Sequence, residues 1–241
     1  MTAALTLVHG WGLGSAIWQP LLTNLGVPYR LLDLPGYGID AGNLAWSVDN
    51  ISQWMHDQLL PGSHVLAWSM GGMLALRLAS EYPRLFSRLT LVATTPRFVA
   101  ANDWIFGATA VDMRRFDALL QRSYPFFVRR FISMLGIGDM QLRRQLADQV
   151  LLEKQITMNV LKGSLRLLLE LDLRPRLDQI SIPVTVIHGD VDRIIPVGSA
   201  DFLVEALPNG CLHRVKRAGH AVFLSHQAEF LAILAGDRHA G

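Results

Sequence analysis

A serine stands in residues 67–72, Ala-Trp-Ser-Met-Gly-Gly, between a short apolar run and a segment of helical period. A sharp strand-to-helix turn lifts such a serine hydroxyl out of a sheet and crowds the residues two positions before and after it, so both must be small. Gly71 and Ala67 meet this requirement, although glycine is usual where Ala67 stands. The pattern predicts a nucleophile elbow with Ser69 at its tip, and it requires a strand before the turn and a helix after it.

The rest of the chain alternates in the same way between short apolar runs and longer segments of helical period. The strand candidates are residues 5–8, 29–32, 64–67, 89–92, 184–188 and 212–215. The helix candidates are residues 16–25, 48–60, 70–82, 197–207 and 228–234. The first five strand candidates lack a polar-apolar alternation, which is typical of strands buried on both faces. This order predicts βαβ units and a mostly parallel, doubly wound α/β sheet.

Residues 97–176 interrupt the alternation, because they show helical patterns, as at residues 116–120, 126–135 and 161–171, and no convincing strand. We interpret them as a helical cap inserted into a core formed by residues 1–96 and 177–241. The insert holds 13 Lys and Arg against 8 Asp and Glu, a net charge of +5, which leaves −3 for the rest of the chain. Such an excess suits either an ordinary solvated helical face or a surface that binds an acidic partner.

A serine hydroxyl needs a base to remove its proton and a carboxylate to fix the tautomer of that base. In this architecture the acid and then the histidine follow the serine in the chain. His220 lies in a glycine-marked loop after the last strand candidate, and Asp192 lies in the loop after the fifth. Asp190 is the alternative acid, but we favour Asp192. The other histidines lie at strand ends, in strands, in or beside helices, or in the tail: His9, His56, His64, His188, His213, His226 and His239.

Two backbone N–H groups are candidates for binding an oxyanion. In an elbow, one donor is the N–H directly after the nucleophile, which here belongs to Met70. The second comes from the loop after the first strand, residues 9–12, His-Gly-Trp-Gly, where Trp11 is the best candidate. The alternative for this glycine-rich segment is a tight turn without a catalytic role.

Composition and charge exclude several other classes of protein. The single cysteine, Cys211, cannot form an internal disulfide, and no Cys/His cluster has the spacing of metal ligands, so we expect neither a metal nor another cofactor. A net charge of +2 argues against nucleic-acid binding. The sequence shows no charged leader before the first apolar run and no apolar window of about 18 residues. We therefore expect a cytoplasmic monomer that does not associate with membranes.

Several motifs together indicate a family. They are residues 7–13 with Trp18, residues 33–38 (Asp-Leu-Pro-Gly-Tyr-Gly), residues 68–72, Pro96-x-Phe98 with Asp103-Trp104, and residues 218–226. With these motifs the chain resembles the serine α/β-hydrolases from residue 5 to about residue 234. Within that superfamily it is most similar to the pimeloyl-[acyl-carrier protein] methyl ester carboxylesterases of biotin synthesis.

The resemblance implies an α/β-hydrolase fold and hydrolysis of the methyl ester of pimeloyl-acyl carrier protein by the triad Ser69, Asp192 and His220. The alternatives are a short-chain carboxylesterase or thioesterase of the same fold, which would act on small-molecule esters, and a receptor without activity. The chain departs from the family at Ala67, and we expect one or two strands to be missing at the N-terminal edge of the sheet. The expected substrate-binding residues are Trp11, Trp68, Met70 and Phe98. The expected carrier-binding residues are Arg129, Arg130, Arg143 and Arg144, of which Arg130 and Arg143 match family positions.

Overall fold

The computed structural model describes residues 4–38, 44–152 and 156–239, and within these residues six strands form one sheet. The strands are β1 (Leu5–Val8), β2 (Tyr29–Leu32), β3 (Ser63–Trp68), β4 (Phe86–Val92), β5 (Val184–Gly189) and β6 (Gly210–Val215). Their order is β2-β1-β3-β4-β5-β6, and every pairing is parallel. Parallel pairing brings the carboxyl ends of all six strands to one edge of the sheet, where open α/β sheets place their ligand sites.

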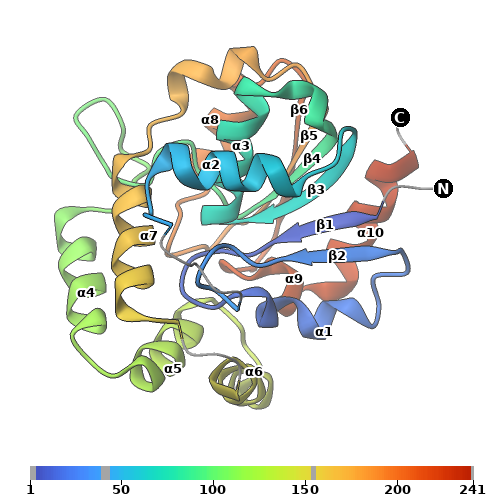
Figure 1. Ribbon diagram of the computed structural model, residues 1–241. Helices are drawn as coiled ribbons and strands as arrows, with labels where there is room; N and C mark the ends of the chain where they lie inside the picture. Colours follow the sequence, from blue (N-terminus) through green and yellow to red (C-terminus); the bar gives the residue numbers. More distant parts are fainter. Residues whose placement is uncertain (1–3, 39–43, 153–155, 240–241) are drawn as a thin grey trace.

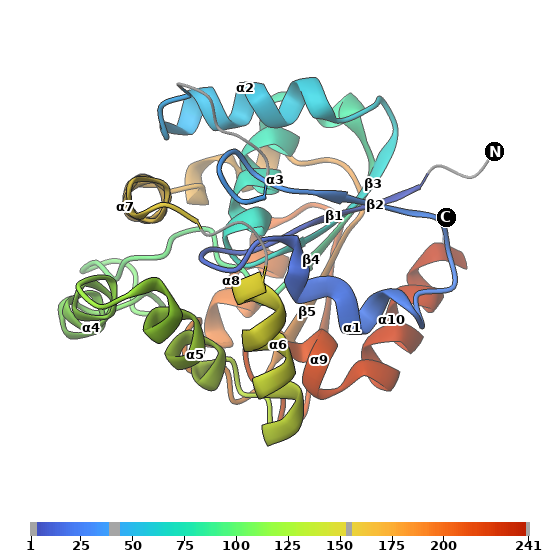
Figure 2. The same ribbon diagram turned by 60° about the horizontal axis from the view of Figure 1, so that its bottom comes forward.

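Helices cover both faces of this sheet. Outside the region between β4 and β5 they are α1 (Gln19–Leu22), α2 (Val48–Gln58), α3 (Met70–Glu81), α8 (Gly198–Ala206), α9 (Val222–Ser225) and α10 (Gln227–His239). Figures 1 and 2 show α2 and α3 on one face and α1, α9 and α10 on the other. Helix α8 packs against β5 and β6. The doubly wound arrangement expected from the sequence is therefore present.

The strand predictions agree with the structure within three residues at every end, but the expected burial of β2 is wrong. Tyr29 and Arg30 of β2 are exposed, whereas β1, β4 and β5 are largely or fully buried. The reason is position, because β2 pairs only with β1 and forms an edge of the sheet. In the described residues no further strand extends the sheet beyond β2.

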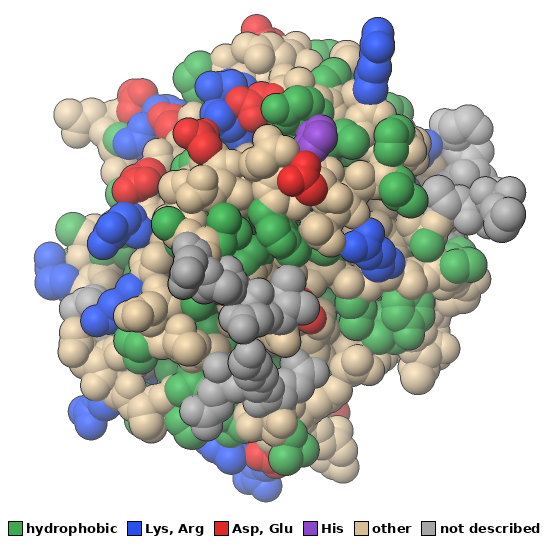
Figure 3. All heavy atoms as spheres, in the orientation of Figure 1, with side chains coloured by type: hydrophobic (Ala, Val, Ile, Leu, Met, Phe, Trp, Pro, Cys, Tyr) green, Lys and Arg blue, Asp and Glu red, His purple; other side chains and the backbone are tan. Residues whose placement is uncertain are grey.

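Four helices make up most of the region between β4 and β5. They are α4 (Ala110–Leu120), α5 (Tyr124–Met134), α6 (Met140–Leu152) and α7 (Met158–Glu170). Figure 1 shows them beyond the edge of the sheet at which the strand arrows end. In Figure 3, Lys and Arg side chains are spread over the side of the molecule on which Figure 1 places α4 and α7. No helix in the described ranges combines the length and apolar character needed to cross a bilayer.

The chain enters and leaves this helical region at one point. Arg97 and Asp172 form an antiparallel bridge, and the Arg97 Nη1 atom lies 2.6 Å from Asp172 Oδ2. Arg174 Nη2 contacts the same oxygen at 2.6 Å, while its guanidinium lies over the ring of Trp104. Hydrogen bonds from Arg174, together with those from Arg97, lower the pKa of Asp172 to about 2. This cluster ties together the two ends of the helical region.

Asp172→Asn should lower the free energy of unfolding by about 1 kcal/mol at pH 7, a figure that allows for screening by solvent. The carboxyl of an unfolded chain titrates at a pKa of about 3.9. Because the folded-state pKa is lower, the stabilisation is fully present above the unfolded-state pKa and is lost as the pH falls toward 2. Urea unfolding of both proteins from pH 7 down to pH 2.5 measures the difference. If the difference in the free energy of unfolding between the two proteins does not shrink on acidification, this role of Asp172 is contradicted.

Candidate active site

Ser69 occupies a strained position between β3 and α3. Its backbone φ of 54° and ψ of −118° are rarely adopted by residues other than glycine. The Ser69 N–H donates to the Val92 carbonyl (2.9 Å), and the Thr94 hydroxyl donates to the Ser69 carbonyl (2.7 Å). A Cβ atom on Gly71 would lie 2.5 Å from the carbonyl oxygen of His9. The turn therefore needs glycine at position 71, and Thr94 is a support that the sequence patterns did not reveal.

The structure brings Ser69, His220 and Asp192 together, although they are far apart in the chain. His220 Nε2 lies 3.0 Å from Ser69 Oγ, and His220 Nδ1 lies 2.8 Å from Asp192 Oδ2. His220 and Asp192 are buried, whereas Ser69 is partly exposed. This is the geometry in which a histidine can accept the proton of a serine hydroxyl while a carboxylate holds its other nitrogen.

Asp192 is held as a carboxylate although it is buried. Its Oδ1 atom accepts the N–H groups of Ile194 (2.8 Å) and Ile195 (3.1 Å). Burial opposes ionisation, but the neighbouring His220 and the N–H donors hold the pKa of Asp192 below its ordinary value. Asp190, the alternative acid, is exposed and accepts the N–H of Arg217. The geometry thus favours Asp192 over Asp190.

His188 lies behind the acid and was expected only to abut the end of β5. Its Nε2 atom is 2.9 Å from the Ile195 carbonyl, which can only accept, so Nε2 carries the proton. The same atom is 3.4 Å from Asp192 Oδ2. Burial lowers the pKa of His188, and the imidazole therefore stays neutral at pH 7.

The loop after β1 passes directly over the nucleophile. A Cβ atom on Gly10 would lie 2.8 Å from Trp68 Cε3 and 3.1 Å from Ser69 Cβ, so the loop can approach this closely only with glycine there. His9 fixes the peptide that joins Gly10 to Trp11. The Leu34 N–H donates to His9 Nε2 (3.0 Å), so Nδ1 carries the proton and donates to the Gly10 carbonyl (2.7 Å). The direction of the Trp11 N–H is set by the same peptide plane.

The helical region between β4 and β5 also holds this loop, through α7. Trp11 Nε1 donates to the Leu161 carbonyl of α7 (3.1 Å). The Gly12 N–H donates to the Tyr37 hydroxyl (3.3 Å), which lies 2.8 Å from the Ser164 hydroxyl of α7. Burial raises the pKa of Tyr37, so the phenol stays protonated and can donate to Ser164. Helix α7 is therefore linked to the candidate oxyanion loop directly at Trp11 and through Tyr37 at Gly12.

The end of α5 contacts the histidine loop. The Ala221 N–H donates to the Leu135 carbonyl (3.0 Å). A Cβ atom on Gly219 would lie 2.7 Å from the Cα atom of Gly136, so the two backbones touch. The helical region thus contacts both the loop that carries Trp11 and the loop that carries His220.

The four expected substrate-binding residues are all buried. Trp68 Nε1 donates to the His220 carbonyl (2.9 Å), so its side chain supports the histidine loop from within. Phe98 packs against Phe116 of α4, with ring centroids 6.1 Å apart, and Met70 is fully buried at the start of α3. The cavity described below is not lined by Trp11, Trp68, Met70 or Phe98 among the described residues. Their role in substrate binding stays a prediction.

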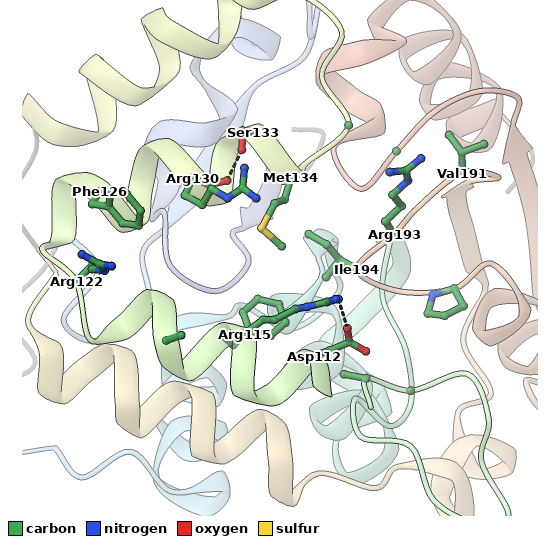
Figure 4. Close-up of a pocket in the computed structure, with 17 residues that line it drawn as sticks. Asp112, Arg115, Arg122, Phe126, Arg130, Ser133, Met134, Val191, Arg193 and Ile194 are labelled. Carbon is green, nitrogen blue, oxygen red and sulfur yellow. Dashed lines mark hydrogen bonds and ion pairs between the residues drawn. The ribbon is translucent and has the colours of Figure 1, made fainter. Parts of the chain in front are cut away.

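The four expected carrier-binding arginines lie on α5 and α6. Arg129 pairs with Asp148 (3.0 Å), which ties one helix to the other. Arg129, Arg143 and Arg144 line a shallow hollow between the two helices. Arg130, next to Arg129, instead lines a larger cavity between α4, α5 and the loop after β5 (Figure 4). The adjacent arginines therefore belong to two different surfaces. In the described part of the chain no group of three or more His, Cys, Asp or Glu side chains is placed to hold a metal ion.

Comparison with known proteins shows the family. A model of the alpha/beta hydrolase family matches residues 7–233. The chain belongs to this family. It is 36% identical to the pimeloyl-[acyl-carrier protein] methyl ester esterase of Nitrosomonas europaea, an alignment that covers 95% of this chain and 92% of that protein. It is 32% identical to the protein of the same name from Aeromonas hydrophila, over 95% of this chain and 93% of that one.

Solved structures of other alpha/beta hydrolases share the fold. An esterase from Exiguobacterium antarcticum superimposes with a TM-score of 0.83 at 21% identity, over 97% of this chain and 91% of that one. A bromoperoxidase from Bacillus anthracis gives a TM-score of 0.85 at 22% identity, over 98% and 91% of the two chains. The α/β-hydrolase fold expected from the sequence is confirmed.

The geometry predicts that Ser69 alone among the serines reacts with a fluorophosphonate probe. We expect labelling at Ser69 in the native protein, no labelling in Ser69→Ala, and a loss of at least about a hundredfold in labelling rate in His220→Ala, because the base is gone. Intact-mass and peptide mass spectrometry measure both. Labelling at a different serine in the native protein would contradict the assignment of the nucleophile.

Proposed function

We propose that this alpha/beta hydrolase is a serine carboxylesterase that hydrolyses the methyl ester of pimeloyl-acyl carrier protein in biotin synthesis. The observation that carries the proposal is the continuous contact from Ser69 through His220 to Asp192, found in a chain 36% identical to an esterase of that name. The proposal includes a monomer in the cytoplasm. It needs no metal or organic cofactor, because the mechanism uses only the side chains and amides of this chain.

In the proposed mechanism Ser69 Oγ attacks the ester carbonyl carbon while His220 Nε2 takes its proton. The tetrahedral intermediate collapses, the bond to the methoxy oxygen breaks, and His220 returns the proton so that methanol leaves. A water molecule then attacks the acyl-serine, gives a proton to His220 and releases the carboxylic acid, and Ser69 regains its proton. Asp192 stabilises the imidazolium ion in both halves, which its ionised state permits.

The N–H groups of Met70 and Trp11 would bind the oxyanion in this mechanism. Met70 is the first residue of α3, where a backbone N–H has no partner within its helix. The Trp11 peptide is held in place by His9, over Ser69. Donors that are fixed before the reaction lose no energy to reorientation as the charge develops.

Two other functions compete with this proposal. A short-chain carboxylesterase or thioesterase would use the same triad, since the fold does not fix the substrate. The buried aromatic residues around Trp11, including Phe116, Phe127 and Phe131, suit an acyl chain of either kind. A receptor without activity would have no need of an ionised acid, a base and a strained serine in contact, so we place it last.

The decisive experiment compares kcat/KM for methyl pimeloyl-acyl carrier protein with kcat/KM for free short-chain methyl esters, with purified protein. A preference for the carrier-bound ester of about a hundredfold or more supports the proposal. Equal or higher activity on the free esters would assign the protein to the short-chain esterases. Activity on neither kind of ester would favour the receptor without activity.

Asp192→Asn should reduce kcat by about a thousandfold or more, because the histidine loses the partner that fixes its tautomer. Ser69→Ala should be at least as severe. The matched control is Asp190→Asn, which changes an exposed carboxylate on the same loop and should alter kcat less than about threefold. Steady-state kinetics on one ester, with circular dichroism to verify folding, measure these effects. An exchange of the two aspartate results would make Asp190 the acid.

Neutralising Arg130 and Arg143 together should raise KM for a carrier-bound ester and weaken its dependence on salt, while a free short-chain ester is unaffected. Acyl carrier proteins are acidic, and exposed charges act mainly on association and are screened beyond about 8 Å at physiological salt. The measurement is KM for both substrates at low and high ionic strength. An equal rise in KM for both substrates would mean that the arginines support the structure of the cap region. No change for either substrate would mean that they belong to an ordinary solvated surface.

A further inference from the structure

A cavity of about 1160 Å³ lies between the cap helices α4 and α5 and the loops that follow β5 and β6. Gly219, the residue before His220, lines it, as do Val191 and Arg193 on either side of Asp192. The cavity therefore borders the two loops that carry the base and the acid. Figure 4 shows its lining residues on α4, on α5 and on the loop after β5.

Positive charge dominates this cavity. Four arginines and one carboxylate line it: Arg115, Arg122, Arg130, Arg193 and Asp112. Asp112 is already engaged, because it accepts from the Thr109 hydroxyl (2.6 Å) and lies 3.2 Å from Arg115. Among the described residues Arg122, Arg130 and Arg193 take part in no ion pair, and Arg122 stacks over Phe126. We call Arg122, Arg130 and Arg193 the arginine cluster.

The rest of the lining is apolar or neutral. Phe116, Met134 and Ile194 contribute apolar surface, and Figure 4 shows the labelled side chains of Met134 and Ile194 between Arg130 and Arg193. A ligand that matches this surface has an uncharged chain and an anionic group. Guanidinium groups bind the oxygens of phosphate in a bidentate manner, and more than one of them can share a single phosphate.

We propose that the arginine cluster binds the phosphate group of the arm on which the acyl substrate is carried. This inference rests on the proposed function. An acyl carrier protein holds its acyl chain as a thioester on an uncharged pantetheine arm, and a phosphodiester joins that arm to the protein. With the ester at Ser69, the arm leaves along the cavity beside the His220 loop, and the phosphate reaches the arginine cluster. The hollow lined by Arg129, Arg143 and Arg144 is left for the protein surface of the carrier.

The test uses two small substrates that differ only in the phosphate. They are the methyl pimeloyl thioesters of 4′-phosphopantetheine and of pantetheine. The native enzyme should show a kcat/KM about tenfold higher or more on the phosphorylated substrate, as expected for a charge-assisted contact. The double variant Arg130→Gln/Arg193→Gln should bring the ratio close to one. Because both substrates use the same triad, any general damage to the acid loop cancels in the ratio.

Arg114→Gln is the matched control. Arg114 is exposed on α4 next to Arg115, carries the same charge and does not line the cavity. This variant should keep the native ratio. A native ratio near one, or an unchanged ratio in the double variant, would overturn the phosphate site. A ratio lowered equally by Arg114→Gln would also overturn it, because the effect would then come from overall charge.

A competition experiment separates this proposal from the proposed function. Free 4′-phosphopantetheine should inhibit hydrolysis of a short-chain ester more strongly than pantetheine does, and the double variant should abolish the difference. That result supports the phosphate site even if neither pimeloyl thioester is hydrolysed, in which case only the proposed substrate fails. Equal inhibition by both compounds would overturn the site. A higher kcat/KM on methyl pimeloyl-coenzyme A than on the carrier-bound ester would overturn the carrier as the source of the phosphate.

Discussion

The backbone of Ser69 stands in a conformation that costs a residue with a side chain about 1–3 kcal/mol, and the surrounding structure keeps it there. The sheet supplies the first restraint, because the Ser69 N–H continues the ladder with β4 at Val92. The Thr94 hydroxyl supplies the second, on the carbonyl side. Close packing of Gly71 against His9 then fixes how near the first strand can come. The turn thereby brings Ser69 next to the loop after β1, because β1 and β4 both pair with β3.

The helical region completes the site by touching the two loops that the sheet alone leaves free. Helix α7 holds the loop after β1 through Trp11 and Tyr37, and the end of α5 holds the loop after β6 through Ala221. These bonds are buried, where the loss of one partner leaves the other unsatisfied and costs about 1–3 kcal/mol. A change in the packing of α5 or α7 is therefore transmitted to the candidate base or to the candidate oxyanion donor, without any direct contact with the substrate.

Local patterns in the sequence are sufficient for those parts of the fold that depend on neighbouring residues. The predicted bounds of β1 and β2 match the structure, and the strand-turn-helix pattern around Ser69 is present. Periodicity does not indicate which strand lies at an edge of the sheet. The prediction that β2 is buried on both faces is therefore wrong. Helix α6 was not singled out, since only Leu146, Ala147 and Val150 of its residues are buried. The helix expected at residues 16–25 is instead a short 3₁₀ turn followed by the single turn α1.

Contacts between side chains that are far apart in the chain could not be predicted from the sequence. Tyr37 and Ser164 are 127 positions apart, and no motif connects them. His188 was interpreted as a residue at a strand end, because its approach to Asp192 exists only after the loop folds back. The net charge of the insert was visible in the composition, but the separation of Arg129 from Arg130 onto two surfaces depends on the rotation of α5.

The junction at Arg97 and Asp172 has a consequence for how proteins of this architecture diversify. A segment whose two ends lie in contact can be lengthened, shortened or exchanged without moving the strands on either side, because closing a longer loop costs only slightly more entropy. The sheet, the elbow and the loops that follow the strands can then stay constant while the exchanged helices present a new surface. Substrate range can thus change by replacement of one contiguous stretch of the gene, and the chemistry is kept where the new helices still bond the loops that carry Trp11 and His220.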